Sequence, residues 1–265
     1  MLSTTSPSST TKTRIARVPF LNCLPFYAHW AEDDTVELVE VPPRQLGVLA
    51  LEGGVDAGPM AVADFLRLED RFERLGLWGI ATAKEAMSVL LFSQRPLWQL
   101  AGETIGVTEQ TSTSYLLLRL LLESRHNVQP SQYVVGARDD VAAVLVIGDE
   151  ALRESRGELA RRYPFLTDLG AEWWQWQLVP AVFAVWAVRK TLPEAVKTAL
   201  SRQLGLSVAE SLRRVPELAA AHAADLHHTP AQLQAYLQAF TYRLTQAEER
   251  GLERFRQLAA ERELL

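Results

Sequence analysis

The sequence predicts an α/β fold of two lobes with a cleft between them. Short apolar runs alternate with helical segments through the first two thirds of the chain, as in βαβ units with parallel strands. This alternation restarts near Glu103, which indicates a second lobe, and beyond Leu192 the pattern is helical. We therefore expect a first lobe from residues 13–94 and 186–265 and a second lobe from residues 95–185. A cleft between two lobes is a favoured place for binding a small molecule.

Each expected strand is a short apolar or alternating run that stops at a proline, a glycine or a polar turn. In the first lobe we expect a strand that ends at Asn22, strands Val36–Val41, Val55–Met60 and Ala86–Ser93, and helices Arg44–Leu51 and Ala63–Leu68. In the second lobe we expect strands Glu103–Thr108 and Ala142–Ile147 and helices Tyr115–Leu122 and Glu150–Arg162. The strand-like run Pro180–Val188 then leads to helices over 193–214, 216–224 and 230–264, the last with a break near Thr245 or Gly251.

Composition excludes several classes of protein. With 265 residues, 48% of them hydrophobic and 22% charged, the chain is long enough to bury a substantial core. A net charge of -5 argues against a nucleic-acid partner. Residues 1–12 are rich in Ser and Thr and lack the apolar core of a secretory signal, so we expect a flexible tail and a cytoplasmic protein. No apolar run is long enough for a membrane span, and the oligomeric state is not predicted.

Asn22 is the first candidate site residue. It follows an apolar run and precedes Pro25, so its amide is expected beyond the end of the first strand. Ligands of open α/β sheets collect at the carboxyl ends of strands. The alternative is that Asn22 only caps the turn before Pro25.

Four consecutive hydroxyl residues precede the helix predicted from Tyr115: Thr111, Ser112, Thr113 and Ser114. Free N–H groups and the dipole at a helix start attract an anion, and the hydroxyls add donors. A single hydroxyl would be enough for an ordinary helix cap. We therefore expect this segment to bind a carboxylate or a phosphate.

Two further polar segments are expected at the cleft. Gly148 and Asp149 directly follow an apolar strand, where Asp149 is either a base or the cap of the next helix. Ser88 is either a buried hydroxyl bonded to the backbone or a donor toward the cleft.

No cofactor or metal site is expected. The five histidines are scattered without the spacing of a zinc helix, and Cys23 is the only cysteine. Phosphate-binding and dinucleotide-binding glycine motifs and the nucleophile elbow of serine hydrolases are absent. Four tryptophans either stack on a ligand ring or pack the core: Trp173, Trp174, Trp176 and Trp186.

Several segments, in order over residues 17–189, together resemble the menaquinone-biosynthesis chorismate dehydratases of the futalosine pathway. They are RVPFLNCLPF at 17–26, GGVDAG at 53–58, SVLLFSQRPLWQLAGETIGVT at 88–108, TSTSYLLLRLLL at 111–122, VLVIGDEAL at 144–152 and YPFLTDLGAEWWQWQLVPAVFAVWAVR at 163–189. The resemblance implies the two-lobed fold of the type II periplasmic-binding proteins, with mixed sheets. It also implies a carbon–oxygen lyase that converts chorismate to 3-[(1-carboxyvinyl)oxy]benzoate and water. A non-catalytic protein that binds a small carboxylate is the alternative.

The implied reaction needs donors for a carboxylate and a base for a C–H proton. Donors at Ser88 and at residues 111–114 would stabilise negative charge as it spreads to the ring carboxylate. The base is either Asp149 or the enolpyruvyl carboxylate of the substrate itself, which is tethered close to the proton. Asn22 would then hydrogen-bond the enolpyruvyl group or the departing hydroxyl.

Overall fold

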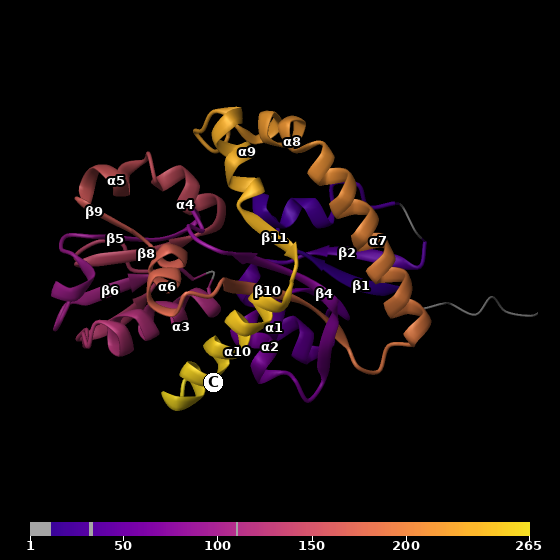
Figure 1. The fold of residues 1–265 in the computed structure, drawn as a ribbon, viewed down its shortest axis with the longest axis horizontal. Helices are drawn as coiled ribbons and strands as arrows, with labels where there is room; N and C mark the ends of the chain where they lie inside the picture. The colour runs from indigo at the N-terminus through magenta and orange to yellow at the C-terminus, as the bar shows by residue number, and fades with distance from the viewer. Residues whose placement is uncertain (1–11, 32–33, 110) are drawn as a thin grey trace, which may run out of the picture.

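The computed structural model describes residues 12–31, 34–109 and 111–265, which form two α/β lobes, each built on one sheet (Figure 1). The first sheet has the strand order β11 (Phe240–Arg243), β4 (Phe72–Thr82), β10 (Ala181–Arg189), β3 (Ala57–Ala61), β1 (Thr13–Arg17) and β2 (Val36–Glu40). The second has the order β7 (Gln132–Val135), β6 (Thr104–Val107), β8 (Ala143–Ile147), β5 (Val89–Ser93) and β9 (Phe165–Asp168). The expected two-lobed α/β architecture is confirmed.

Both sheets are mixed. In the first, β1 pairs in parallel with β2 and β3, with Ile15 opposite Leu38 and Ala57, whereas β10 runs antiparallel to β3 and β4. In the second, β6 is parallel to β7 and β8, and β5 is antiparallel to β8 and β9. The carboxyl ends of β1, β3 and β8 all lead to residues that line the space between the lobes.

The helices cover the sheets and complete each lobe. In the first lobe they are α1 (Pro43–Glu52), α2 (Val62–Arg67), α7 (Glu194–Arg213), α8 (Val215–His222), α9 (Pro230–Gln238) and α10 (Gln246–Glu261), with a 3-10 helix at Leu21–Phe26. In the second they are α3 (Thr113–Arg119), which continues as a π-helix over Leu120–Arg125, α4 (Gly148–Glu154), α5 (Glu158–Arg162) and α6 (Leu169–Gln177), with a 3-10 turn at Leu97–Gln99. Every helix in the described part of the chain is too short or too polar to cross a bilayer.

The chain passes between the sheets at 83–88 and again at 178–180. The expected division assigned residues 89–94 to the first lobe and cut the chain at 185/186. Hydrogen bonding instead places β5 in the second sheet and the whole of β10 in the first. Arg95 and Pro96 follow the end of β5, but the chain does not change lobe there. Strand β5 belongs to the second lobe because it pairs with β8 and β9.

Three expected elements need correction. The expected helix Glu150–Arg162 is two helices, α4 and α5. The first strand ends at Arg17 rather than at Asn22. Asn22 lies in the 3-10 helix Leu21–Phe26, after Pro19 and before Pro25. Proline cannot donate to a strand ladder, so the segment between these two prolines leaves the sheet. The last predicted helix is two helices, α9 and α10, separated by β11, with Thr245 capping α10.

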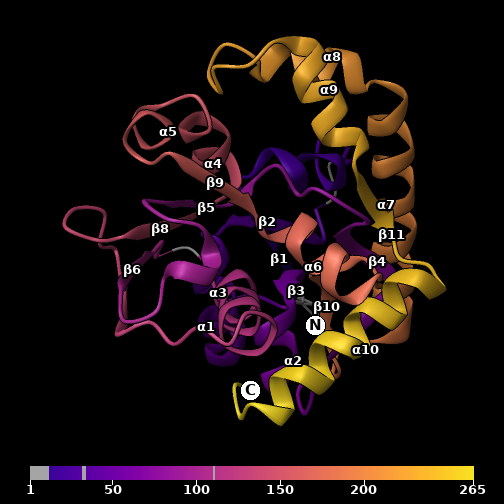
Figure 2. The same cartoon turned by 60° about the vertical axis from the view of Figure 1, so that its left-hand side comes forward.

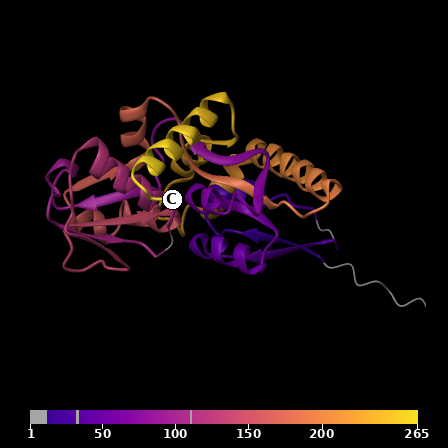
Figure 3. The same cartoon turned by 90° about the horizontal axis from the view of Figure 1, so that it is seen from below.

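Helix α10 runs alongside both lobes, and the residues that follow it form hydrogen bonds to each lobe (Figures 2 and 3). It follows β11 of the first lobe, and Arg67 of that lobe donates to the carbonyl of Leu264 just beyond it. Arg262 donates to the carbonyl of Glu123 and to the hydroxyl of Ser124, both in the π-helix of the second lobe. The chain end is therefore hydrogen-bonded to both lobes.

Candidate functional site

A cavity lies between the lobes. It collects side chains from the ends of β1, β3 and β8, from the start of β5 and α3, and from β10 and β11. The residues that line it carry no charged side chain: Val18, Phe20, Asn22, Cys23, Pro43, Pro59, Ala61, Ile80, Ser88, Val89, Thr111, Ser112, Thr113, Ser114, Ile147, Gly148, Phe183, Ala184 and Phe240. An anionic ligand would therefore meet hydroxyl, amide and backbone groups among apolar walls.

The structure brings together seven of the eight residues expected at the site. Asn22, Ser88, Gly148 and the segment 111–114 all line the cavity. Asp149 is not among the lining residues. Its carboxylate Oδ1 instead accepts the backbone N–H of Leu21 at 2.8 Å, across the lobe boundary.

Asn22 presents a polar atom without a partner. Its side-chain Oδ1 is buried and forms no hydrogen bond within the described residues. Such an atom costs free energy unless a ligand or water satisfies it, so it marks a place where a ligand hydrogen bond is favourable. Because an amide carries an acceptor and two donors, Asn22 can both accept from a ligand hydroxyl and donate to a carboxylate.

The 3-10 helix that carries Asn22 is held from two sides. On one side, the Ser207 and Ser211 hydroxyls of α7 each donate to the carbonyl of Pro25 at 3.1 Å. Phe26 packs edge to face on Trp186 of β10, with ring centroids 5.4 Å apart. On the other side, Asp149 accepts from Leu21. Asn22 is thus fixed at the cavity by both lobes.

Burial raises the pKa of Asp149 above its usual range, with the Leu21 N–H and the charge of Arg153 acting in the opposite direction. Desolvation disfavours the charged form of a carboxyl group. The carboxyl group of Asp149 is a structural acceptor between the lobes in this conformation.

The hydroxyl-rich start of α3 contacts the first lobe. Ser112 donates to the carboxylate Oδ2 of Asp64 at 2.9 Å, and Thr113 accepts the backbone N–H of Ala63 at 3.1 Å. Thr111 accepts from the Ser114 N–H at 3.2 Å in the manner of a helix cap. The Ser114 hydroxyl lines the cavity and has no hydrogen-bond partner in the described part of the chain. One hydroxyl of this segment therefore caps the helix, two join the lobes, and the Ser114 hydroxyl remains available to a ligand.

Ser88 sits at the start of β5 with 1% of its surface exposed. Its hydroxyl donates to the carbonyl of Ala86 at 3.3 Å and accepts the hydroxyl proton of Tyr236 at 2.9 Å. Tyr236 belongs to α9 of the first lobe and was not expected at the site. No local pattern could have identified it, because 148 residues separate it from Ser88.

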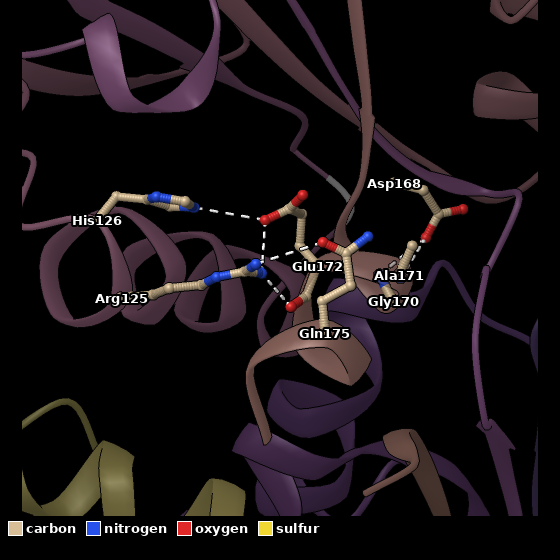
Figure 4. Close-up of polar contacts among 7 residues, drawn as sticks. All are labelled: Arg125, His126, Asp168, Gly170, Ala171, Glu172 and Gln175. Carbon is tan, nitrogen blue, oxygen red and sulfur yellow. Dashed lines mark hydrogen bonds and ion pairs between the residues drawn. The ribbon is translucent and has the colours of Figure 1, made fainter. Parts of the chain in front are cut away.

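The segment before Ser88 is clamped by Asp168, the N-cap of α6. The Asp168 carboxylate accepts four backbone N–H groups, those of Gly170 and Ala171 at the helix start and those of Ala86 and Met87 in the first interlobe connection. Figure 4 shows Asp168 beside Gly170 and Ala171. One carboxylate therefore joins the start of α6 to the chain segment that positions Ser88.

The next turn of α6 is tied to the π-helix. Arg125 donates to the Glu172 carboxylate at 2.6 Å, and His126 lies 3.4 Å from the same group (Figure 4). Of the four tryptophans considered for ring stacking, Trp173 and Trp186 are buried in the core, and none of the four lines the cavity. The aromatic walls are instead Phe20, Phe183 and Phe240.

A family model described as "Menaquinone biosynthesis" matches residues 13–261, nearly the whole chain. This chain belongs to that menaquinone biosynthesis family. A curated relative from Thermus thermophilus, named chorismate dehydratase, is 30% identical over 258 residues, which cover 89% of this chain and 94% of the relative.

Solved structures share the fold of this family member. Protein AF1704 from Archaeoglobus fulgidus superposes with a TM-score of 0.77 at 18% identity and covers 97% of this chain and 99% of its own. The periplasmic aliphatic sulphonate binding protein SsuA from Escherichia coli superposes with a TM-score of 0.64 at 16% identity, covering 96% and 93%. The fold is therefore that of the periplasmic-binding proteins, as the sequence resemblance implied.

Proposed function

We propose that this protein is a chorismate dehydratase of menaquinone biosynthesis, a carbon–oxygen lyase that eliminates water from chorismate to give 3-[(1-carboxyvinyl)oxy]benzoate. The observation that carries the proposal is the unpartnered, buried amide oxygen of Asn22 in a cavity lined by hydroxyls, in a member of this family. The named relative from Thermus thermophilus supports the choice of substrate.

The chemistry fits the lining of the cavity. The ring hydroxyl leaves together with the hydrogen on the carbon that bears the enolpyruvyl ether, and the ring becomes aromatic. Negative charge left by the departing proton spreads through the diene onto the ring carboxylate. The hydroxyls of Ser88 and Ser114 can donate to that carboxylate among largely apolar walls, where such bonds are stronger than in water.

We place the base in the substrate. The Asp149 carboxyl group already accepts the Leu21 N–H and does not line the cavity. The enolpyruvyl carboxylate is covalently tethered next to the proton that must leave, so proximity favours it. Asn22 would hydrogen-bond the enolpyruvyl group and hold this carboxylate in position, since an amide is too weak a base to remove the proton itself.

Incubation of the purified protein with chorismate tests the proposal. Mass spectrometry is expected to detect a product lighter by one water, and the absorbance of the cyclohexadiene is expected to give way to that of a substituted benzoate. Asn22→Ala is expected to form this product about a hundredfold more slowly, or slower still. Chorismate binding without product would favour the alternative of a non-catalytic carboxylate-binding protein.

A further inference from the structure

A buried hydrogen bond joins the two lobes directly behind the cavity. The Tyr236 hydroxyl of α9 donates to the Ser88 Oγ at 2.9 Å, and each residue has 1% of its surface exposed. Ser88 lines the cavity, whereas Tyr236 does not. Tyr236 therefore meets any ligand only through Ser88.

The hydroxyl proton of Ser88 makes only a weak hydrogen bond within the protein. A serine hydroxyl has one proton and two lone pairs, and Tyr236 occupies one of those lone pairs. The Ser88 proton is directed to the carbonyl of Ala86 over 3.3 Å, which is long for a hydroxyl donor. A carboxylate in the cavity would offer that proton a stronger, charge-assisted acceptor.

We propose that Tyr236 is a positioning residue for the dehydration reaction, because its hydroxyl holds Ser88 as a donor toward the substrate carboxylate. The inference rests on the proposed function. By occupying a lone pair of Ser88, Tyr236 fixes the Oγ and polarises its O–H bond, since hydrogen bonds in a chain strengthen one another. The effect is greatest in the transition state, where charge on the carboxylate increases.

Tyr236 can fill this role throughout the neutral range. Burial raises the pKa of Tyr236 well above its usual value, and the charge of Asp149 acts in the same direction, although the bond to Ser88 opposes it. The phenol therefore keeps its proton and remains a donor. Its ring is anchored edge to face on Phe240 at 5.1 Å, so removing the hydroxyl alone would leave the packing in place.

Tyr242 provides a matched control. It is also a buried tyrosine of the first lobe, in β11, with 3% exposed. Its hydroxyl has no hydrogen-bond partner among the residues that the structure describes. Tyr242→Phe therefore removes a buried hydroxyl without touching Ser88.

Steady-state kinetics with chorismate test the inference on Tyr236→Phe, Tyr242→Phe, Ser88→Ala and the double variant Ser88→Ala with Tyr236→Phe. Loss of one supporting hydrogen bond is expected to lower kcat about threefold to tenfold in Tyr236→Phe with little change in KM. Tyr242→Phe is expected to match the wild type, and the double variant is expected to match Ser88→Ala. A wild-type kcat in Tyr236→Phe would overturn the inference while leaving the proposed function intact. So would an equal fall in kcat when Tyr236→Phe is added to Ser88→Ala. A wild-type protein that does not dehydrate chorismate would overturn both.

Discussion

Gly148 of the second lobe lies against the ring of Phe20 of the first lobe, so closely that a Cβ at position 148 would be 2.6 Å from the Phe20 Cζ. Gly148 also has a φ of +63°, in the left-handed region that favours glycine. Both residues line the cavity. The lobes can approach this closely at the cavity because position 148 has no side chain.

Gly148→Ala is therefore expected to push the Phe20 ring away and distort the cavity. We expect kcat/KM for chorismate to fall at least tenfold, and the free energy of unfolding to fall by about 1–2 kcal/mol from the backbone conformation and the contact. Gly102→Ala is the control, because Gly102 also has a positive φ, +74°, but nothing lies within 4 Å of its Cβ position. If the two variants had equal activity, steric contact with Phe20 would be irrelevant to function.

Asn22→Ala is expected to lower kcat about a hundredfold or more while the protein remains folded, since removal of one group that contacts the reacting atoms typically has this effect. The measurement is turnover of chorismate together with circular dichroism. Asn127→Gly is the control at the only other asparagine, which is exposed and has a φ of +53° that glycine adopts without strain. Full turnover by Asn22→Ala would remove Asn22 from the mechanism.

Asp149→Asn is expected to retain kcat within about threefold, because the amide oxygen of asparagine can still accept the Leu21 N–H. Asp149→Ala lacks this acceptor and is expected to lose more activity by releasing the 3-10 helix that carries Asn22. The two variants are compared in kcat and in chorismate affinity. An inactive, folded Asp149→Asn with unchanged affinity would assign the role of base to Asp149.

The raised pKa of Asp149 also predicts a pH dependence of stability. In the unfolded chain this carboxyl group loses its proton near pH 4, whereas in the folded protein it holds the proton to a higher pH. The contribution of Asp149 to the free energy of unfolding therefore falls as the pH rises from about 4 through the pKa of the folded state. The test is urea unfolding of the wild type and of Asp149→Asn at several pH values. As the pH rises over this range, the wild type is expected to lose stability relative to the variant. A constant difference would mean that Asp149 has an ordinary pKa.

Asp168→Ala is expected to destabilise the protein by about 2–4 kcal/mol, since four backbone N–H groups lose their acceptor. Because two of them precede Ser88, kcat should fall as well. Asp139→Ala is the control on the same lobe, as the Asp139 side chain is 86% exposed. Thermal unfolding of the two variants gives the comparison, and equal midpoints would show that the clamp contributes little.

The sequence was most informative where polar residues follow apolar runs. Asn22 and Gly148 were expected at the cleft for this reason, the segment 111–114 was expected because its hydroxyls precede a helix, and all of them line the cavity. Strand β4 was not expected, because its sequence FERLGLWGIAT mixes charged residues and two glycines with apolar ones. Its pairing with β10 and β11 defines it as a strand, and pairing between distant segments leaves no local pattern.

The contacts that organise the site were likewise beyond local patterns. Asp64 meets Ser112 across 48 positions, and Tyr236 meets Ser88 across 148. Asp168 has the sequence of an ordinary helix cap, and its second role on the segment before Ser88 appears only in three dimensions. The lobe boundaries differ from those expected for the same reason, as β5 resembles any buried apolar strand.

The contacts of α10 have a thermodynamic consequence for ligand capture. Two lobes that are joined only by two chain segments can rotate widely relative to each other. A ligand that closes such lobes must offset the entropy that is lost when this rotation is restricted. Here Arg262 and Arg67 attach the end of the chain to both lobes, so the empty protein already has less rotational freedom to lose. More of the interaction free energy with a small ligand then remains available for affinity and for orienting the reacting atoms.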